Sequence, residues 1–88
     1  MAPKLLAAAR ALLDGAANEL VKLGPKATAA QQKKALQRCV EALNELDAAE
    51  GNFIQSIEAE DLSEAIDELA AGTKLKERRN VADAWRDW

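Results

Sequence analysis

The side chains of this sequence that could do chemistry are mostly carboxylates, and most of them lie in one window. Between Cys39 and Thr73 there are ten Asp and Glu residues and no Lys or Arg. The 38 residues before this acidic window hold seven basic residues and two acids, and the 15 after it hold five and three. The regional charges are +5, −10 and +2, which sum to the net −3 of the chain. A surface of one sign attracts a partner of the opposite sign, so the pattern predicts electrostatic recognition.

Catalysis by the usual nucleophiles is not expected. The chain has no His and no Tyr, which removes the commonest general base and the Ser–His and Cys–His pairs. Its one cysteine, Cys39, shares a helical apolar stripe with Leu36, Val40 and Leu43, which predicts a buried, inert thiol. We therefore expect a protein that is not an enzyme and uses no cofactor.

A metal site is not expected either. The segment from Asp47 to Glu58 has the twelve-residue length of an EF-hand loop. Ala49 and Gly51, however, occupy positions that should donate oxygen, and the glycine comes one residue too early. The chain also lacks the Glu-x-x-His pair of a di-iron bundle.

Three interpretations of the acidic window remain open. Like-charge pairs at i,i+4, such as Glu60 with Glu64 and Glu64 with Glu68, each cost an isolated helix ~0.2–0.5 kcal/mol. Such a face can simply be solvated and keep a small protein in solution. It can instead be a docking surface for a basic protein, where its field raises the association rate and the selectivity. Finally, a row of carboxylates can mimic the phosphates of a nucleic acid.

We expect docking to use the densest part of the acidic window together with one aromatic anchor. Trp and Arg are the residues most enriched at binding hot spots, and Arg86 lies between Trp85 and Trp88. The alternative for the two tryptophans is closure of one end of a helical core. The predicted partner-binding residues are Glu58, Glu60, Asp61, Glu64, Asp67, Glu68 and Trp88.

The basic residues form two groups, one between residues 22 and 38 and one between residues 74 and 79. Binding nucleic acid through them would require a basic domain or an aromatic stacking platform, and the pI of about 4.9 argues against direct nucleic-acid binding. We expect these residues to offset the acidic window within the molecule.

Two helices are predicted in the first half of the chain. Apolar residues at three- and four-residue steps indicate a helix that starts near Pro3 and stops at Gly24-Pro25, with Gly15 at a close helix crossing. Thr28 followed by Gln31 has the form of a capping box for a second helix, which ends before Gly51. The predicted apolar faces are Leu5, Ala9, Leu12, Leu13, Ala16, Leu20 and Leu23, then Leu36, Cys39, Val40, Leu43 and Leu46.

The second half of the chain predicts a third helix and a less regular end. The five-residue step from Ile57 to Leu62, with Asp61 and Glu64 as a second capping box, predicts a kink or a fresh helix start near residues 58–61. Gly72 suits the position after this helix. A last helix capped by Thr73 would carry Leu75, Val81, Ala82, Trp85 and Trp88.

These elements predict an all-α fold, a small three- to four-helix up-and-down bundle with residues 1–88 as one helical domain. Twenty residues are alanines, which bury little area each, so the core is thin and a homodimer would help it. It rests on twelve leucines together with Val21, Val40, Phe53, Ile54, Ile57 and Ile66.

The expected location is the cytoplasm. A single cysteine permits no internal disulfide and suits a reducing compartment. Arg10 and Asp14 interrupt the apolar run near the N-terminus before it reaches the length of a signal peptide. No uncharged stretch approaches the ~18–20 residues of a membrane span, so no membrane association is expected.

One resemblance can be drawn from two strings. The segment Phe53-Ile54-Gln55-Ser56-Ile57-Glu58-Ala59-Glu60-Asp61-Leu62 and the terminal Ala84-Trp85-Arg86-Asp87-Trp88 resemble the C-terminal half of small acidic bacterial proteins, several of which are immunity partners of toxins. The resemblance implies stoichiometric neutralisation of a partner enzyme, without catalysis. It transfers no binding residue to this chain.

The function expected from the sequence is a non-catalytic, protein-binding one. Most concretely, an acidic inhibitor or immunity-type protein would neutralise a partner, such as a toxin enzyme, by docking its acidic helices on a basic surface. The alternatives are a structural or regulatory helical homo-oligomer and a nucleic-acid mimic.

Overall fold

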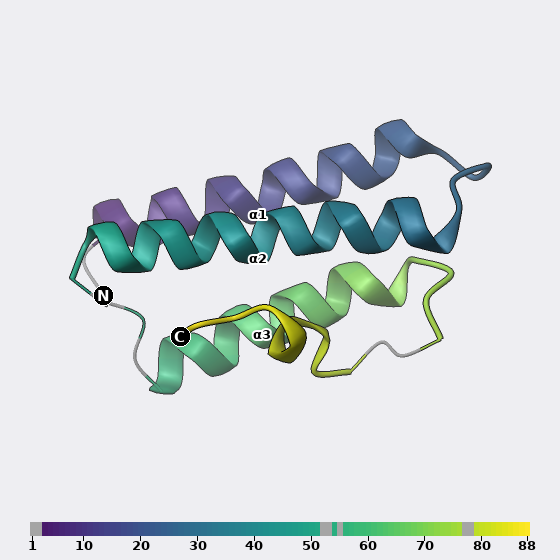
Figure 1. The fold of residues 1–88 in the computed structure, drawn as a ribbon. Coiled ribbons are helices and arrows are strands. Elements are labelled where there is room, and N and C mark those ends of the chain that lie inside the picture. Colours follow the sequence, from purple (N-terminus) through teal and green to yellow (C-terminus); the bar gives the residue numbers. More distant parts are fainter. Residues whose placement is uncertain (1–2, 52–53, 55, 77–78) are drawn as a thin grey trace.

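The computed structural model describes residues 3–51, 54, 56–76 and 79–88, and the regular structure within these ranges is entirely helical. Three α-helices, α1 (Pro3–Leu23), α2 (Ala29–Ala49) and α3 (Ser56–Ala71), are followed by a short 3-10 helix, η1 (Val81–Ala84). The chain reverses direction at both connections between the α-helices (Figure 1). The all-α prediction is confirmed. Phe53, expected in the core, lies outside the described residues, as does the side chain of Ile57.

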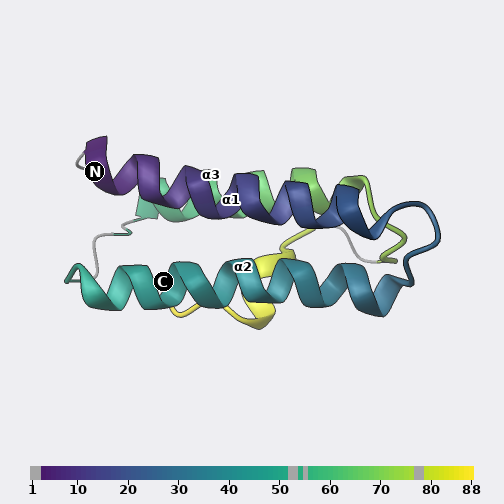
Figure 2. The same cartoon turned by 90° about the horizontal axis from the view of Figure 1, so that it is seen from above.

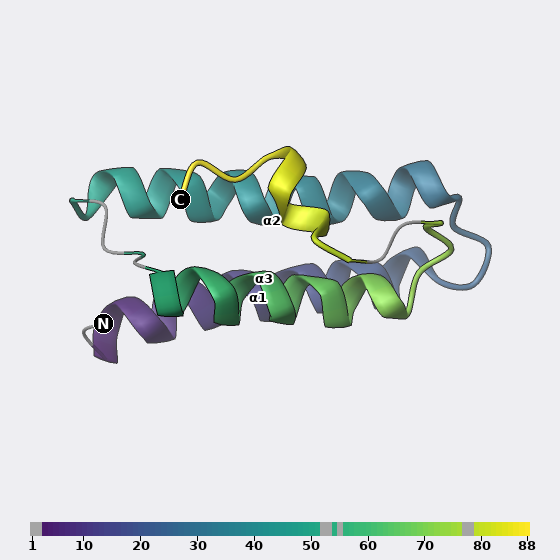
Figure 3. The same ribbon diagram turned by 90° about the horizontal axis from the view of Figure 1, so that it is seen from below.

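The elements form two layers in a molecule with principal extents of 39 × 21 × 16 Å. α1 and α2 lie side by side as one layer and make the most extensive contact between any two elements. The second layer consists of α3, which lies beneath α1, and the C-terminal segment (residues 79–88), which lies beneath α2 (Figures 2 and 3). The C-terminal segment therefore takes the place that a fourth helix would have had.

The connection between α1 and α2 follows from its sequence. Gly24 adopts φ 73°, a conformation that favours glycine, and its N–H bonds to the carbonyl of Val21 at 3.1 Å. Thr28 then caps α2, because its Oγ1 accepts from the N–H of Gln31 while the Gln31 side chain accepts from the N–H of Thr28. The predicted helix stop and capping box are both confirmed.

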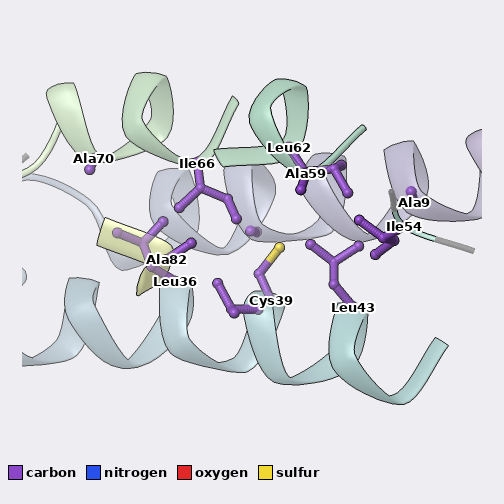
Figure 4. Close-up of a cluster of buried hydrophobic side chains, with 12 residues drawn as sticks. Ala9, Leu36, Cys39, Leu43, Ile54, Ala59, Leu62, Ile66, Ala70 and Ala82 are labelled. Carbon is purple, nitrogen blue, oxygen red and sulfur yellow. The ribbon is translucent and has the colours of Figure 1, made fainter. Parts of the chain in front are cut away.

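The core lies between the two layers and is built mainly from one face of α2 (Figure 4). Leu36, Val40, Leu43 and Ile66 are the largest side chains that are fully buried. The described residues of α1 that are buried are two alanines, Ala9 and Ala16, and three of its leucines pack against the core while only partly buried. Small side chains let helices approach closely, but each buries little area. The other buried apolar residues are Ala9, Ala16, Ala27, Ala35, Cys39, Ile54, Ala59, Leu62, Ala70 and Ala82.

α3 is one continuous helix from Ser56 to Ala71, so the predicted fresh start near residues 58–61 is wrong. The apolar stripe that seemed broken is completed by Ala59, which is buried along with Leu62, Ile66 and Ala70. Steps of three and four residues join these positions, as one face of a helix requires. Ala59 fills the gap in the apolar stripe that was left when only the larger apolar residues were considered.

The last helix that the sequence suggested over residues 73–88 is not found in the described ranges 73–76 and 79–88. The hydroxyl of Thr73 donates to the carbonyl of Ala70 and accepts from the N–H of Leu75 at 3.3 Å, so it terminates α3 and caps no new helix. Asn80 then adopts the left-handed conformation with φ 52°, which interrupts any right-handed helix. Only the single 3-10 turn of η1 follows.

Two further expectations on α1 are wrong. Val21, placed in the predicted core, is 78% exposed, because it lies about 100° around the helix from Leu20, which packs against the core. Gly15 is exposed, and a Cβ built on it would meet no atom of another element within 4 Å, so it marks no close helix crossing.

Candidate functional site

Asp67, in the second half of α3, holds the start of η1. Its Oδ2 accepts from the backbone N–H of Asn80 at 2.9 Å, and its Oδ1 accepts from that of Val81 at 3.0 Å. One carboxylate thus satisfies two adjacent backbone donors at a turn where Asn80 is left-handed. This clamp fixes the C-terminal segment against α3.

Asn44 of α2 holds the other end of the same segment. Its Nδ2 donates to the carbonyl of Trp85 at 2.8 Å, and its Oδ1 accepts from the N–H of Asp87 at 3.0 Å. The segment is therefore fastened to both α3 and α2 by side chains, although it contains little regular structure of its own.

Between α3 and the clamped segment lies an acidic hollow of about 340 Å³. Its carboxylates come from three successive turns of α3 and from η1, so residues distant in the sequence meet on one surface. Five of its eight described lining residues are acidic and one is basic. The lining residues are Glu60, Asp61, Ser63, Glu64, Asp67, Asn80, Asp83 and Arg86.

Arg86, the one cation among the described lining residues of the acidic hollow, is already engaged within the protein. Its Nε lies 2.9 Å from Oδ1 of Asp83, its Nη1 donates to Oγ of Ser63 at 3.1 Å, and its guanidinium carbon lies 5.4 Å from the Trp88 ring centroid. It offsets one carboxylate, so the lining keeps an excess of four negative charges, five carboxylates against one guanidinium. Such a surface can accept hydrogen bonds from, and attract, a cationic side chain.

Four of the predicted partner-binding residues, Glu60, Asp61, Glu64 and Asp67, line the acidic hollow. Glu60, Asp61 and Glu64 are exposed there. Asp67 is half-buried, and both of its carboxylate oxygens accept the hydrogen bonds of the clamp. Glu58, at the start of α3, and Glu68, which is exposed, lie outside the lining.

Trp88 lies against the core and outside the acidic hollow. It is half-buried, packs against the buried cluster, and its indole Nε1 is buried without a hydrogen-bond partner among the described residues. A buried donor left unpaired costs about 1–3 kcal/mol. Despite this cost, the packing of the ring against the buried cluster favours closure of the core as its main role.

Asp83 and Arg86 belong to the site but were not predicted to be part of it. Both residues lie in the segment that was expected to form a last regular helix, and the sequence did not indicate which of its side chains would face α3. The only signal in the sequence was Asn80, a residue type that tolerates the left-handed conformation and so marks a break in the helix.

The two ion pairs found between described residues do not neutralise the acidic window. Arg38 of α2 pairs with Glu19 of α1, and Arg86 pairs with Asp83, so both acids come from outside residues 39–73. These pairs do not provide the offset that we expected between the basic groups and the acidic window. The carboxylate of Asp47 has a structural role, because its Oδ1 accepts from the N–H of Ile54 at 2.8 Å inside the protein.

Cys39 is buried, as the apolar stripe predicted, and its Sγ lies 3.6 Å from the carbonyl oxygen of Leu12. Burial raises the pKa of this thiol to about 11. The thiolate, which is the nucleophilic form, is therefore scarce at neutral pH.

Comparisons with protein-family models, with curated proteins and with solved structures find no match to this chain. Within residues 3–51, 54, 56–76 and 79–88, no group of three or more His, Cys, Asp and Glu side chains could hold a metal ion. No helix in these ranges combines the length and the apolar character that crossing a membrane requires.

Proposed function

We propose that this protein is a non-catalytic binding protein whose acidic hollow docks a basic surface of a partner protein. The observation that carries the proposal is the convergence of five carboxylates from α3 and η1 on one hollow that holds a single, already paired cation. Neutralising a partner enzyme by blocking a basic cleft, as an immunity-type protein does, is the most concrete form of this function.

The clamp at Asp67 supports the proposal because it pre-organises the hollow. A docking surface loses less entropy on binding when its walls are fixed beforehand. The carboxylates of Glu60, Asp61 and Glu64 stand on a regular helix, and Asp83 is fixed by η1 and its pairing with Arg86. A protruding Lys or Arg of the partner fits the charge of this hollow.

The exposed position of these carboxylates indicates what they contribute. Exposed charges mainly speed association and select the partner, while each adds little affinity. Binding should therefore weaken with salt, because the Debye length shrinks from ≈ 10 Å at 0.1 M to about 3 Å at 1 M. Under this proposal the protein acts in the cytoplasm, without a cofactor, as an up-and-down bundle completed by its C-terminal segment.

Self-association is the weaker of the alternatives. Leu6 and Val21 are the large apolar side chains found exposed among the described residues. They lie fifteen residues apart on α1, which is about 22 Å along a helix, so they form no common patch.

A nucleic-acid mimic would use the same carboxylates, and DNA would then compete with the protein for its partner.

Capture from an extract of the native host tests the proposal with matched variants. The hollow variant Glu60→Gln/Asp61→Asn/Glu64→Gln and the control variant Glu41→Gln/Glu45→Gln/Glu50→Gln each remove three exposed carboxylates, and the control residues lie outside the hollow. We expect one protein to be retained at low salt by the wild type and the control but not by the hollow variant. Equal retention by all three, or no retained protein, would count against the proposal.

A further inference from the structure

A second hollow, of opposite charge, adjoins η1. It has a volume of about 400 Å³, and it shares Asn80 with the acidic hollow. The α1–α2 connection and the start of the chain after α3 lie at the same end of the molecule (Figure 1), and the hollow brings Lys33 of α2 together with Lys76 and Arg79. The lining residues of this basic hollow are Lys33, Leu75, Lys76, Arg79, Asn80, Val81, Ala84 and Trp85.

Among the residues that the structure describes, the charge of the basic hollow is uncompensated. Three of its described lining residues, Lys33, Lys76 and Arg79, are cations, and no described lining residue is a carboxylate. All three are exposed, and within the described part of the chain none of them forms an ion pair or a hydrogen bond. Three unpaired cations around one concavity repel one another, and a bound anion would relieve that repulsion.

Apart from Asn80, the rest of the described lining is apolar, and it is held in place from both ends. Leu75, Val81 and Trp85 are half-buried and pack against the core cluster. Lys74 fixes the chain beside them, because its N–H donates to Oε1 of Gln32 at 2.9 Å and its Nζ donates to the carbonyls of Pro25 and Ala27 at 2.9 and 2.6 Å. The other end of the wall is held by Asn44, which bonds to the carbonyl of Trp85.

We infer that the basic hollow binds a small phosphate monoester that carries a flat ring, of the size and class of a mononucleotide. A phosphate monoester bears ≈ −1.5 to −2 charges at pH 7, which three cations can balance. The planar guanidinium of Arg79 can contact two phosphate oxygens at once. Trp85, half-buried at the wall, offers a ring surface on which a base can stack.

Size and surroundings favour a single small ligand over a nucleic-acid strand. The volume of about 400 Å³ lies within the range of about 300–1,000 Å³ that is typical of small-molecule sites. A strand that left the basic hollow past Asn80 would enter the acidic hollow, where Glu64 and Asp83 would repel its phosphates. This inference uses a different set of residues from the acidic docking surface and does not depend on it.

Titration of the full chain with AMP, followed by nitrogen–proton NMR, tests the inference. The indole N–H signal of Trp85 reports binding at the wall, and adenosine and inorganic phosphate serve as the two halves of the ligand. We expect a saturable shift with AMP and at least about tenfold weaker binding of either half, since each lacks one set of contacts. Lys76→Gln and Arg79→Gln should each weaken AMP binding by about tenfold.

Lys22→Gln is the matched control, because it removes one exposed cation at the same end but outside the hollow. AMP should bind this variant within about twofold of the wild type, since screened charges at a distance contribute little. Several results would overturn the inference. They are an equal loss in Lys22→Gln, adenosine binding as tightly as AMP, a single-stranded oligonucleotide binding more tightly than AMP, and a shift that does not saturate at millimolar AMP.

Discussion

The carboxylate of Asp67 reaches from α3 to the first residue of η1, with its Oδ1 3.0 Å from the backbone nitrogen of Val81. Its second oxygen accepts from the neighbouring N–H of Asn80. Asp67 therefore helps to determine where Asp83 and Arg86 lie relative to α3. Because both of its oxygens accept backbone hydrogen bonds, it is not available to bind a partner directly. This clamp, together with the hydrogen bonds of Asn44 and of Arg86 to Ser63, sets the shape of the acidic hollow.

We expect Asp67→Ala to lower the free energy of unfolding by about 1–3 kcal/mol, because it leaves two backbone donors without their acceptor. For a chain of this size each kcal/mol lowers the Tm by roughly 4–8 °C. Glu68→Ala, at the adjacent exposed position, should change stability by less than about 0.5 kcal/mol. Thermal unfolding followed by circular dichroism measures both, and equal effects of the two substitutions would contradict the clamp.

The thin core makes stability sensitive to the few large side chains it contains. Leu36 is fully buried at the centre of α2, so Leu36→Ala should cost about 2–5 kcal/mol, a large share of the stability of a small domain. Val21→Ala removes a side chain that is 78% exposed and should cost less than about 0.5 kcal/mol. Urea unfolding separates these expectations, and a large loss for Val21→Ala would show that α1 packs differently.

Cys39 should make stability depend on pH in the alkaline range. Burial raises the pKa of its thiol from 9.0 to about 11, so the folded state holds this proton more tightly than the unfolded state. The contribution is complete below pH 9 and is lost as the pH rises towards 11, by up to about 2–3 kcal/mol.

Cys39→Ala removes this titration and leaves all others in place. We expect the stability difference between wild type and Cys39→Ala to be constant below pH 9 and to shift in favour of the variant between pH 9 and 11. Urea unfolding at a series of pH values measures this difference. A difference that stays constant up to pH 11 would indicate that the thiol is solvated in the folded protein.

Much of the helical framework could be predicted because local chemistry determines it. Gly24-Pro25 ends α1 and the Thr28–Gln31 capping box starts α2 through contacts within a few residues, so the sequence alone indicates them. The buried stripe of α2 follows from a helical period that its leucines and valine display directly. The predicted fresh start in α3 was wrong because Ala59 was not recognised as a core residue. An alanine is compatible with a core, a surface or a helix interior, so its type alone does not indicate burial.

The candidate site was predictable only on its α3 side. Glu60, Asp61 and Glu64 share one helix, and helical spacing alone places them together. Asp83 and Arg86 join them through the clamp between Asp67 and Asn80, a contact over thirteen residues that no local rule anticipates. Trp88 was expected to be an anchor on composition alone, but its burial depends on how the C-terminal segment folds back.

The central claim is that the acidic hollow, and not the net charge, attracts the partner. Its most direct test is the association rate of the captured partner with the wild type, with Glu60→Gln/Asp61→Asn/Glu64→Gln and with Glu41→Gln/Glu45→Gln/Glu50→Gln, measured by stopped flow at several salt concentrations. At low salt we expect the hollow variant to associate at least about tenfold more slowly than the control variant, with a flatter salt dependence. Equal rates and equal salt dependence for the two variants would contradict the claim, because they would show that only the total charge matters.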